Sequence, residues 1–223
     1  MTEKTIKRIV CYGDSNTFGF DPRDGGRYDR GHRWPEVMQD LLGDGFEVIN
    51  AGFNGRTIAT VIYPNYYGSG KDFFTTSMTG RAPVDLLILM LGSNDCIRSD
   101  SPEQIAAHME TLIQKALTGP WWRKGPQILL AAPVEVAGGR TPAEPFLQAY
   151  SDTVTEATLN DYYCKSRALI PMYRALAKKY GSAFIEAGLY AHAGRVDHVH
   201  LTPESHVCLG QAMAKKVEVI FNT

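Results

Sequence analysis

Apolar residues form short continuous runs along the chain, and longer stretches of mixed polarity separate these runs. Five runs have the length of a β-strand: residues 8–12, 46–50, 85–91, 127–132 and 183–186. A continuous apolar strand is buried on both faces, and strands that alternate with helices are typical of a parallel sheet with crossover helices. The pattern therefore predicts an α/β fold, a three-layer α/β/α sandwich around a five-stranded parallel sheet.

Three of the intervening segments repeat their apolar residues at helical spacing, residues 102–117, 162–180 and 203–221. Ser101 stands at the capping position of the first, and Thr202 caps the third ahead of a proline at the first helical position. No repeat or linker interrupts the 223 residues, a length typical of one α/β domain. We therefore expect a single domain over residues 1–223.

The charge balance and the cysteines narrow the class of protein. Lys and Arg total 23 against 24 Asp and Glu, which leaves no basic field to attract a nucleic acid. The polar N-terminus has no apolar stretch of the kind found in signal peptides, and no run is long enough to cross a membrane. The four cysteines stand far apart and read as free thiols. We expect a cytoplasmic protein with no nucleic-acid or membrane partner.

The segments that directly follow the first three apolar runs carry residues suited to chemistry. In open α/β sheets the ligand site lies beyond the carboxyl ends of the strands. Gly13-Asp14-Ser15 places a serine there, Gly55 can turn a backbone N–H toward the site, and Gly92-Ser93-Asn94-Asp95 adds a side-chain amide. Such donors stabilise an oxyanion by typically ~3 kcal/mol each. Taken singly, each segment is equally consistent with a capped or glycine-containing turn.

A fourth segment, Asp197-His198-Val199-His200, precedes the last predicted helix. An Asp three residues before a His in a loop can turn its carboxylate back toward the imidazole. The carboxylate then holds one tautomer of the ring and stabilises the imidazolium formed when a serine gives up its proton. His198 does not stand at this spacing, so we interpret it as a loop residue.

In order and spacing, these segments resemble the four sequence blocks of the SGNH (GDSL-like) hydrolases. The stretch from Gly13 to Gly19 is most similar to a bacterial branch of arylesterases, carbohydrate acetylesterases and an acyltransferase. The resemblance implies a flavodoxin-like sandwich with Ser15 as nucleophile, His200 as base and Asp197 as the residue that orients the base. It also implies an oxyanion hole made by the N–H groups of Ser15 and Gly55 and the side-chain amide of Asn94.

The expected activity is hydrolysis of short-chain, acetyl-type carboxylic esters of aryl, alkyl or sugar alcohols through an acyl-enzyme on Ser15, without a cofactor. Two alternatives remain open at this stage. The same acyl-enzyme could pass its acyl group to an alcohol, which would make the protein an acyltransferase. The fold could also serve as a non-catalytic module that binds a carbohydrate or a partner. The family relatives are compatible with a homo-oligomer, and the Trp121-Trp122 pair is a candidate subunit contact.

Candidate substrate-binding residues are Phe18, Ser93 and Tyr63, although aromatic side chains more often pack inside the protein. Asp14 and Asp95 are expected to accept hydrogen bonds from neighbouring backbone N–H groups and so to hold their loops.

Two further patterns are interpreted as structural. The histidines near the C-terminus lack the spacing of a zinc-binding helix, so no metal is predicted. Residues 68–71 (Gly-Ser-Gly-Lys) lack the frame of a phosphate-binding loop and are predicted to form a surface turn.

Overall fold

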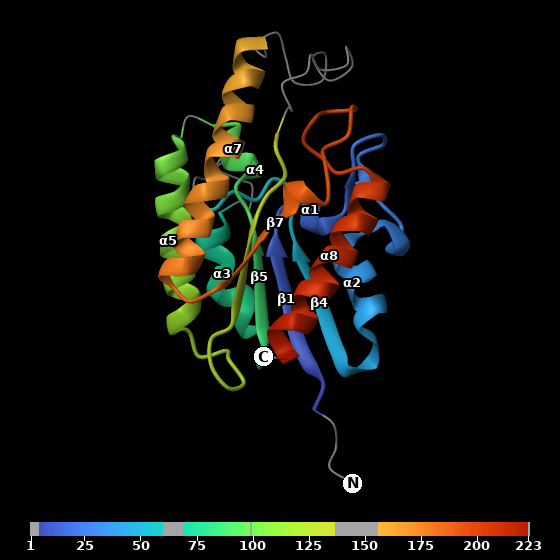
Figure 1. Ribbon diagram of the computed structural model, residues 1–223, viewed down its shortest axis with the longest axis vertical. Helices are drawn as coiled ribbons and strands as arrows, with labels where there is room; N and C mark the ends of the chain where they lie inside the picture. Colours follow the sequence, from blue (N-terminus) through green and yellow to red (C-terminus); the bar gives the residue numbers. More distant parts are fainter. Residues whose placement is uncertain (1–4, 60–68, 99, 137–155, 223) are drawn as a thin grey trace.

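A central parallel sheet organises the molecule, as the computed structural model shows for residues 5–59, 69–98, 100–136 and 156–222 (Figure 1). Its strands are β1 (Lys7–Gly13), β4 (Phe46–Gly52), β5 (Leu86–Met90), β6 (Ile128–Ala132) and β7 (Ala183–Glu186). They pair in parallel in the order β4-β1-β5-β6-β7. Every strand lies on one of the apolar runs, which confirms the predicted α/β fold.

Helices cover both faces of the sheet (Figure 1). One face carries α3 (Gly70–Thr79), α5 (Pro102–Thr118) and α7 (Glu156–Lys179), and the other carries α2 (Trp34–Leu42) and α8 (Pro203–Asn222). Successive strand residues point to opposite faces. In β1, Val10 and Tyr12 therefore join the core under the first group of helices, whereas Ile9 and Cys11 join the core under the second.

The predicted helices are confirmed, with ends that differ by a few residues. The cap of α5 is a reciprocal pair, because the Ser101 hydroxyl accepts the N–H of Gln104 at 3.3 Å while the Gln104 side chain accepts the N–H of Ser101 at 2.8 Å. The remaining short elements are α1 (Ser15–Phe18), α4 (Ser93–Cys96), the antiparallel pair β2 (Phe20–Asp21) and β3 (Gly26–Arg27), and single turns at Arg30–His32, Gly43–Gly45 and Ala187–Leu189.

Two predictions about surface segments are wrong. Ser69 and Gly70 are buried at the start of α3 and not in a surface turn, and the Gly70 carbonyl accepts the Tyr12 hydroxyl at 2.7 Å. Glycine stands there because a Cβ would lie 2.9 Å from the Thr57 carbonyl oxygen. Of the Trp121-Trp122 pair, predicted as a subunit contact, Trp121 packs in the core with its ring 5.6 Å from that of Phe74, whereas Trp122 is half-buried.

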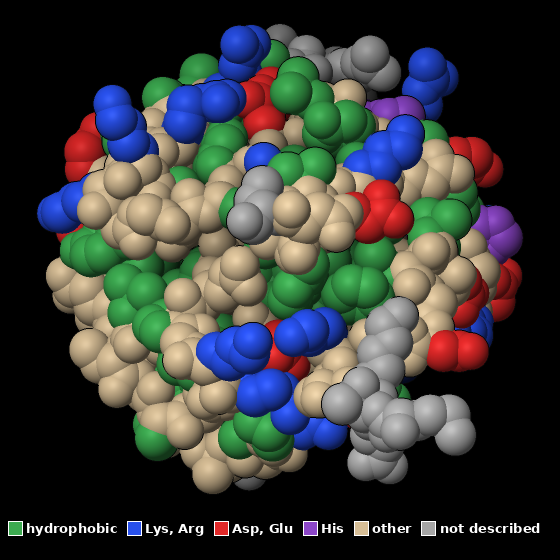
Figure 2. Space-filling view, turned by 60° about the horizontal axis from the view of Figure 1, so that its bottom comes forward, with side chains coloured by type: hydrophobic (Ala, Val, Ile, Leu, Met, Phe, Trp, Pro, Cys, Tyr) green, Lys and Arg blue, Asp and Glu red, His purple; other side chains and the backbone are tan. Residues whose placement is uncertain are grey.

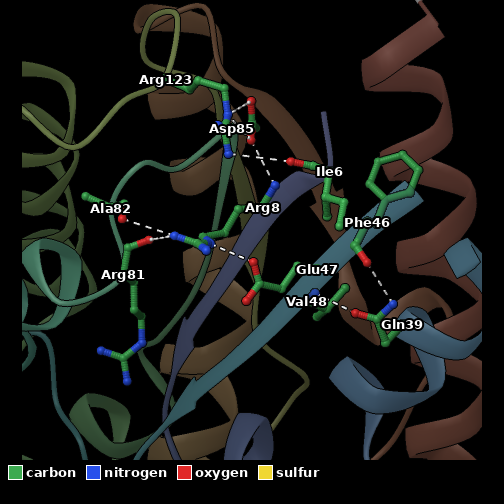
Figure 3. A network of polar contacts seen from close by, with 10 residues as sticks. All are labelled: Ile6, Arg8, Gln39, Phe46, Glu47, Val48, Arg81, Ala82, Asp85 and Arg123. Carbon is green, nitrogen blue, oxygen red and sulfur yellow. Dashed lines mark hydrogen bonds and ion pairs between the residues drawn. The ribbon is translucent and has the colours of Figure 1, made fainter. Parts of the chain in front are cut away.

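Charged side chains close the amino ends of the strands, which Figure 2 turns toward the viewer. The Arg8 guanidinium donates to the carbonyls of Arg81 and Ala82 at 3.1 and 3.0 Å and pairs with Glu47 at 2.7 Å (Figure 3). Asp85 accepts the backbone N–H of Arg8 at 2.8 Å and the side chain of Arg123 at 3.0 Å. These contacts join β1 and β4 to the segment that leads into β5.

In the described part of the chain, no helix combines the length and apolar character that crossing a membrane requires.

The carboxyl ends of the strands are shaped by the close approach of α1. A Cβ on Gly52, the last residue of β4, would lie 2.1 Å from the backbone nitrogen of Phe18 and 2.6 Å from the carbonyl carbon of Thr17. These neighbours are backbone atoms, so they cannot rotate away as a side chain would. Only glycine at this position allows α1 to lie against the end of β4.

We therefore expect Gly52→Ala to lower the free energy of unfolding by roughly 1–3 kcal/mol, the usual cost of forcing extra atoms into a packed site. Thermal denaturation should show a melting temperature lower by several degrees. Gly125→Ala is the matched control, because a Cβ there would meet nothing within 4 Å. Equal melting temperatures for the two variants would contradict the packing argument.

Candidate active site

Ser15 lies at the carboxyl edge of the sheet as the first residue of α1, directly beyond β1. Asp14 caps this short helix by accepting the N–H of Asn16 at 2.9 Å, and Gly19 ends it with a left-handed backbone at φ +90°. Ser15 is 5% exposed. The local sequence thus fixes the serine in a tight turn at the mouth of the sheet.

His200 and Asp197 come from the loop before α8, and His200 meets Ser15 across 185 positions of sequence. The His200 Nε2 lies 2.8 Å from the Ser15 Oγ, and the His200 Nδ1 hydrogen-bonds the Asp197 Oδ2. The other carboxylate oxygen of Asp197 accepts the backbone N–H groups of Val199 and His200 at 3.0 and 2.9 Å. The three side chains therefore form one continuous hydrogen-bonded chain.

The loop geometry also explains the charge state of Asp197. His198 adopts the left-handed conformation at φ +58°, which lets the carboxylate reach the N–H groups just beyond it. Burial raises the pKa of Asp197, but the hydrogen bond and the charge of His200, together with the two N–H groups, outweigh burial and hold the pKa below its usual value. Asp197 is thus an anion placed to stabilise a protonated His200.

Asn16, which is not among the predicted site residues, joins the serine loop to the histidine loop. Its amide Nδ2 donates to the Val199 carbonyl at 3.1 Å, and its Oδ1 accepts the Leu201 N–H at 2.9 Å. The side-chain nitrogen and oxygen of Asn16 thereby hydrogen-bond to the residues on either side of His200. Phe20, also missed, places its ring 4.5 Å from the imidazole. Nothing in the sequence around Asn16 or Phe20 indicates a partner so distant along the chain.

The loops after β4 and β5 flank the serine loop, because β1 lies between these two strands in the sheet. Gly55 takes up φ +72°, a conformation that favours glycine. The Asn94 amide donates to the Arg56 carbonyl at 3.0 Å, and Asp95 accepts the Ile58 N–H at 3.0 and 3.2 Å. The Asn94-Asp95 pair therefore ties the Gly55 loop to the end of β5, and a second hydrogen on the Asn94 nitrogen remains to donate elsewhere.

Asp14 and Asp95 hold their loops as predicted, and both are buried. Burial raises the pKa of Asp14 to about 6, against the opposing effects of the Asn16 N–H and the charge of His200. Burial also raises the pKa of Asp95 to about 7, although the hydrogen bond from the Ile58 N–H opposes it. Both carboxyls consequently titrate near neutral pH.

The structure describes two of the three candidate substrate-binding residues, Phe18 and Ser93. Phe18 is half-buried, and the Arg27 guanidinium lies 4.3 Å from its ring centroid, so this ring has a packing partner. Ser93 is buried at the start of α4. Tyr63 lies outside the described residues. A role in substrate binding stays a prediction for all three.

The histidines near the C-terminus have separate surroundings. His206 is buried, its Nδ1 accepts the Trp34 N–H at 3.4 Å, and burial lowers its pKa to about 3, so it remains neutral. His192 lies near Ser205, with 3.3 Å between its Nδ1 and the serine Oγ. Within the ranges that the structure describes, no three His, Cys, Asp or Glu side chains are grouped as a metal site requires.

Known proteins resemble this chain over most of its length. The sequence profile of the GDSL-like lipase/acylhydrolase family matches residues 11–207. A carbohydrate acetylesterase family member from Sinorhizobium meliloti has a similar structure, with a TM-score of 0.86 and 30% identity over 98% of this chain and 100% of that one. The aryl esterase of M. smegmatis gives a TM-score of 0.83 and 30% identity over 96% and 99% of the two chains.

A curated relative is more distant. The acetylxylan esterase of Xylanibacter ruminicola is 26% identical over 200 residues, which is 80% of this chain and 35% of that protein. The chain therefore spans about a third of the length of this relative. The profile match and the two full-length structural similarities confirm the predicted SGNH hydrolase fold. The chain belongs to the GDSL-like lipase/acylhydrolase family, the ester hydrolases that its motifs resemble.

Proposed function

We propose that the protein is a serine esterase in which Ser15 is the nucleophile, His200 the general base and Asp197 the residue that orients the base. The observation that carries this proposal is the contact of 2.8 Å between the Ser15 Oγ and the His200 Nε2, with Asp197 bonded to the far nitrogen of the ring. A serine, a base within hydrogen-bond reach and a third group that orients the base are what nucleophilic catalysis requires.

In the proposed reaction, the Ser15 oxygen attacks the ester carbonyl while His200 accepts the serine proton. The negative charge that forms on the carbonyl oxygen is stabilised by the N–H groups of Ser15 and Gly55 and by the free hydrogen of the Asn94 amide. His200 then gives its proton to the leaving alcohol, and an acyl group remains on Ser15. Water, activated by His200 in the same way, releases the acid and restores the serine.

The proposed substrates are short-chain esters, above all acetyl esters of aryl, alkyl or sugar alcohols. The support comes from the relatives, which are named for acetylxylan, for carbohydrate acetyl esters and for aryl esters. The aromatic ring of Phe20, 4.5 Å from the His200 ring, adds an apolar surface beside the base.

The first test is Ser15→Ala. We expect hydrolysis of 4-nitrophenyl acetate and of acetylated xylan fragments to fall by at least about 10³-fold, because the acyl-enzyme of the proposed mechanism forms on the Ser15 oxygen. Ser182→Ala is the control, since Ser182 lies in the turn before β7 at the opposite end of the sheet. Undiminished hydrolysis by Ser15→Ala would remove Ser15 from the mechanism, and failure of an organophosphonate to label Ser15 would favour a non-catalytic binding module.

Acyl transfer to an alcohol is a second candidate function, which the burial of the site favours. Ser15, Asp197 and His200 are 5%, 5% and 7% exposed, so little bulk water reaches the reacting groups. An acyl-enzyme screened from water lasts longer and can meet an alcohol first.

Product partitioning decides between the two functions. With 4-nitrophenyl acetate and added benzyl alcohol in water, an acyltransferase yields benzyl acetate in preference to acetate, and the ratio rises with alcohol concentration. The ester and the acid are measured by chromatography. Formation of acetate alone at every alcohol concentration would exclude transfer to this alcohol.

The buried carboxyls of Asp14 and Asp95 make the stability of the fold depend on pH. The pKa of Asp95 is raised to about 7, well above its value in an unfolded chain. The folded state therefore binds the Asp95 proton more tightly than the unfolded chain does. The resulting gain in stability is complete below the unfolded pKa and is lost as the pH rises through the folded pKa of about 7. Asp14, with a pKa of about 6, acts in the same direction.

Asp95→Asn should weaken this pH dependence, because an amide oxygen can still accept the Ile58 N–H without becoming charged. Relative to the wild type, the free energy of unfolding of the variant should rise between pH 4 and pH 8, by at most about 4 kcal/mol. Urea unfolding at both pH values measures the difference. Asp44→Asn, at an exposed position, controls for the substitution itself. Parallel pH curves for wild type and Asp95→Asn would contradict the argument.

A further inference from the structure

Arg56 is a buried cation beside Gly55 that the proposed mechanism does not use. It is 8% exposed. Its Nη1 donates to the carbonyls of Gly13 and Ala51 at 2.8 and 2.6 Å, and its guanidinium carbon lies 4.2 Å from the ring centroid of Tyr12. The Nε has no hydrogen-bond partner within the part of the chain that the structure describes. Removing a guanidinium from water is costly, and these partners offset the cost only in part.

The two carbonyls that Arg56 binds lie at the carboxyl ends of neighbouring strands. Gly13 is the last residue of β1 and stands two positions before Ser15, and Ala51 is the last residue but one of β4. The Gly13 carbonyl also accepts the backbone N–H of Phe53 at 3.1 Å. The Arg56 side chain therefore folds the loop after β4 back onto the strand that leads to the proposed nucleophile.

The backbone of Arg56 adds contacts to the remaining parts of the proposed oxyanion hole. Arg56 directly follows Gly55, its N–H donates to the Phe53 carbonyl at 3.2 Å, and its carbonyl accepts the Asn94 amide at 3.0 Å. One residue thus links the loops that carry Ser15, Gly55 and Asn94. A shift of about 1 Å in such donors is enough to lose much of their effect on a transition state.

We propose that Arg56 is a positioning residue of the oxyanion hole: its side chain fixes the Gly55 N–H and the Asn94 amide relative to Ser15. The proposal rests on the proposed esterase function. The guanidinium also keeps a permanent positive charge in a region with little water, where charges act over longer distances than in solvent. That charge favours the negative oxygen of the transition state over the neutral ester.

Arg8 offers a matched control in the same molecule. Its guanidinium also donates to two backbone carbonyls, those of Arg81 and Ala82, but at the amino ends of the strands (Figure 3). An arginine that serves the fold alone should affect stability and leave catalysis intact. Arg8→Met and Arg56→Met therefore remove the same kind of contact from opposite ends of one sheet.

The experiment measures kcat and KM for 4-nitrophenyl acetate, the inhibition constant of a trifluoromethyl ketone and the melting temperature. The ketone forms a reversible adduct with a serine nucleophile and mimics the oxyanion. For Arg56→Met we expect kcat to fall by about 10²–10³-fold, the usual effect of one oxyanion donor, with KM changed less than about threefold. The inhibition constant should rise by the same factor as kcat/KM falls.

Arg56→Lys should lie between wild type and Arg56→Met, because lysine keeps the charge but lacks the planar fork that binds two carbonyls at once. Arg8→Met should lower the melting temperature while kcat and the inhibition constant stay within about threefold of wild type. If Arg56→Met does not fold, Arg56→Lys decides by the same pair of kinetic readouts.

One outcome for the Arg56 variants would contradict the proposal. A folded Arg56 variant with a lower melting temperature but with kcat and ketone inhibition within threefold of wild type would show that Arg56 serves the fold alone. Failure of the esterase proposal itself would appear elsewhere, as wild-type protein that is no more active than Ser15→Ala.

Discussion

The amide of Asn16 is the contact on which the arrangement of the site depends. Ser15 and His200 are brought together from nearly opposite ends of the sequence, and the 2.8 Å bond between them is one weak link. Asn16 adds two buried hydrogen bonds to the residues on either side of His200. Each contributes only about 1 kcal/mol net, but leaving one buried partner unpaired costs about 1–3 kcal/mol, so the loops resist separation.

The order of the strands in the sheet places further hydrogen-bond donors beside the residues that Asn16 holds together. Because β1 lies between β4 and β5, the serine loop has the Gly55 loop on one side and the Asn94 loop on the other. Asp95 and the Asn94 amide connect these flanking loops. The amino ends of the same strands are closed by ion pairs around Arg8 and Asp85, so the polar groups at the two ends serve different purposes.

The sequence predicted the parts of this structure that depend on local pattern. Strands buried on both faces are continuous apolar runs, and the motif residues Ser15, Asp197 and His200 stand directly in the loops that the structure brings together. α5 with its Ser101 cap follows from the same kind of local information. The order of the strands in the sheet was not predicted, because it depends on which crossover each helix makes, and the short helices α2 and α3, of 9 and 10 residues, were not predicted either.

Contacts that depend on tertiary packing could not be predicted from the sequence. The partners of Asn16 lie 183 and 185 positions away, and nothing in the neighbouring residues indicates them. Glycine is common both in turns and where backbones approach closely, so the sequence around Gly70 does not distinguish an exposed turn from a buried helix start. Trp121 is a similar case, since an aromatic pair between prolines does not indicate whether its rings pack in the core or face solvent.

The buried charges around Ser15 match the way in which the proposed reaction separates charge. When His200 takes the serine proton, a positive ring and a negative carbonyl oxygen form together from neutral groups. Asp197, bonded to the ring, and Asp14, whose pKa burial raises to about 6 against the opposing charges of His200 and Arg56, lie where they favour the imidazolium. Arg56, joined to the loops of Gly55 and Asn94, lies where it favours the oxygen. Charged groups that the fold already holds in place need no reorganisation during the reaction, and this accounts for a site that keeps costly polar groups inside the protein.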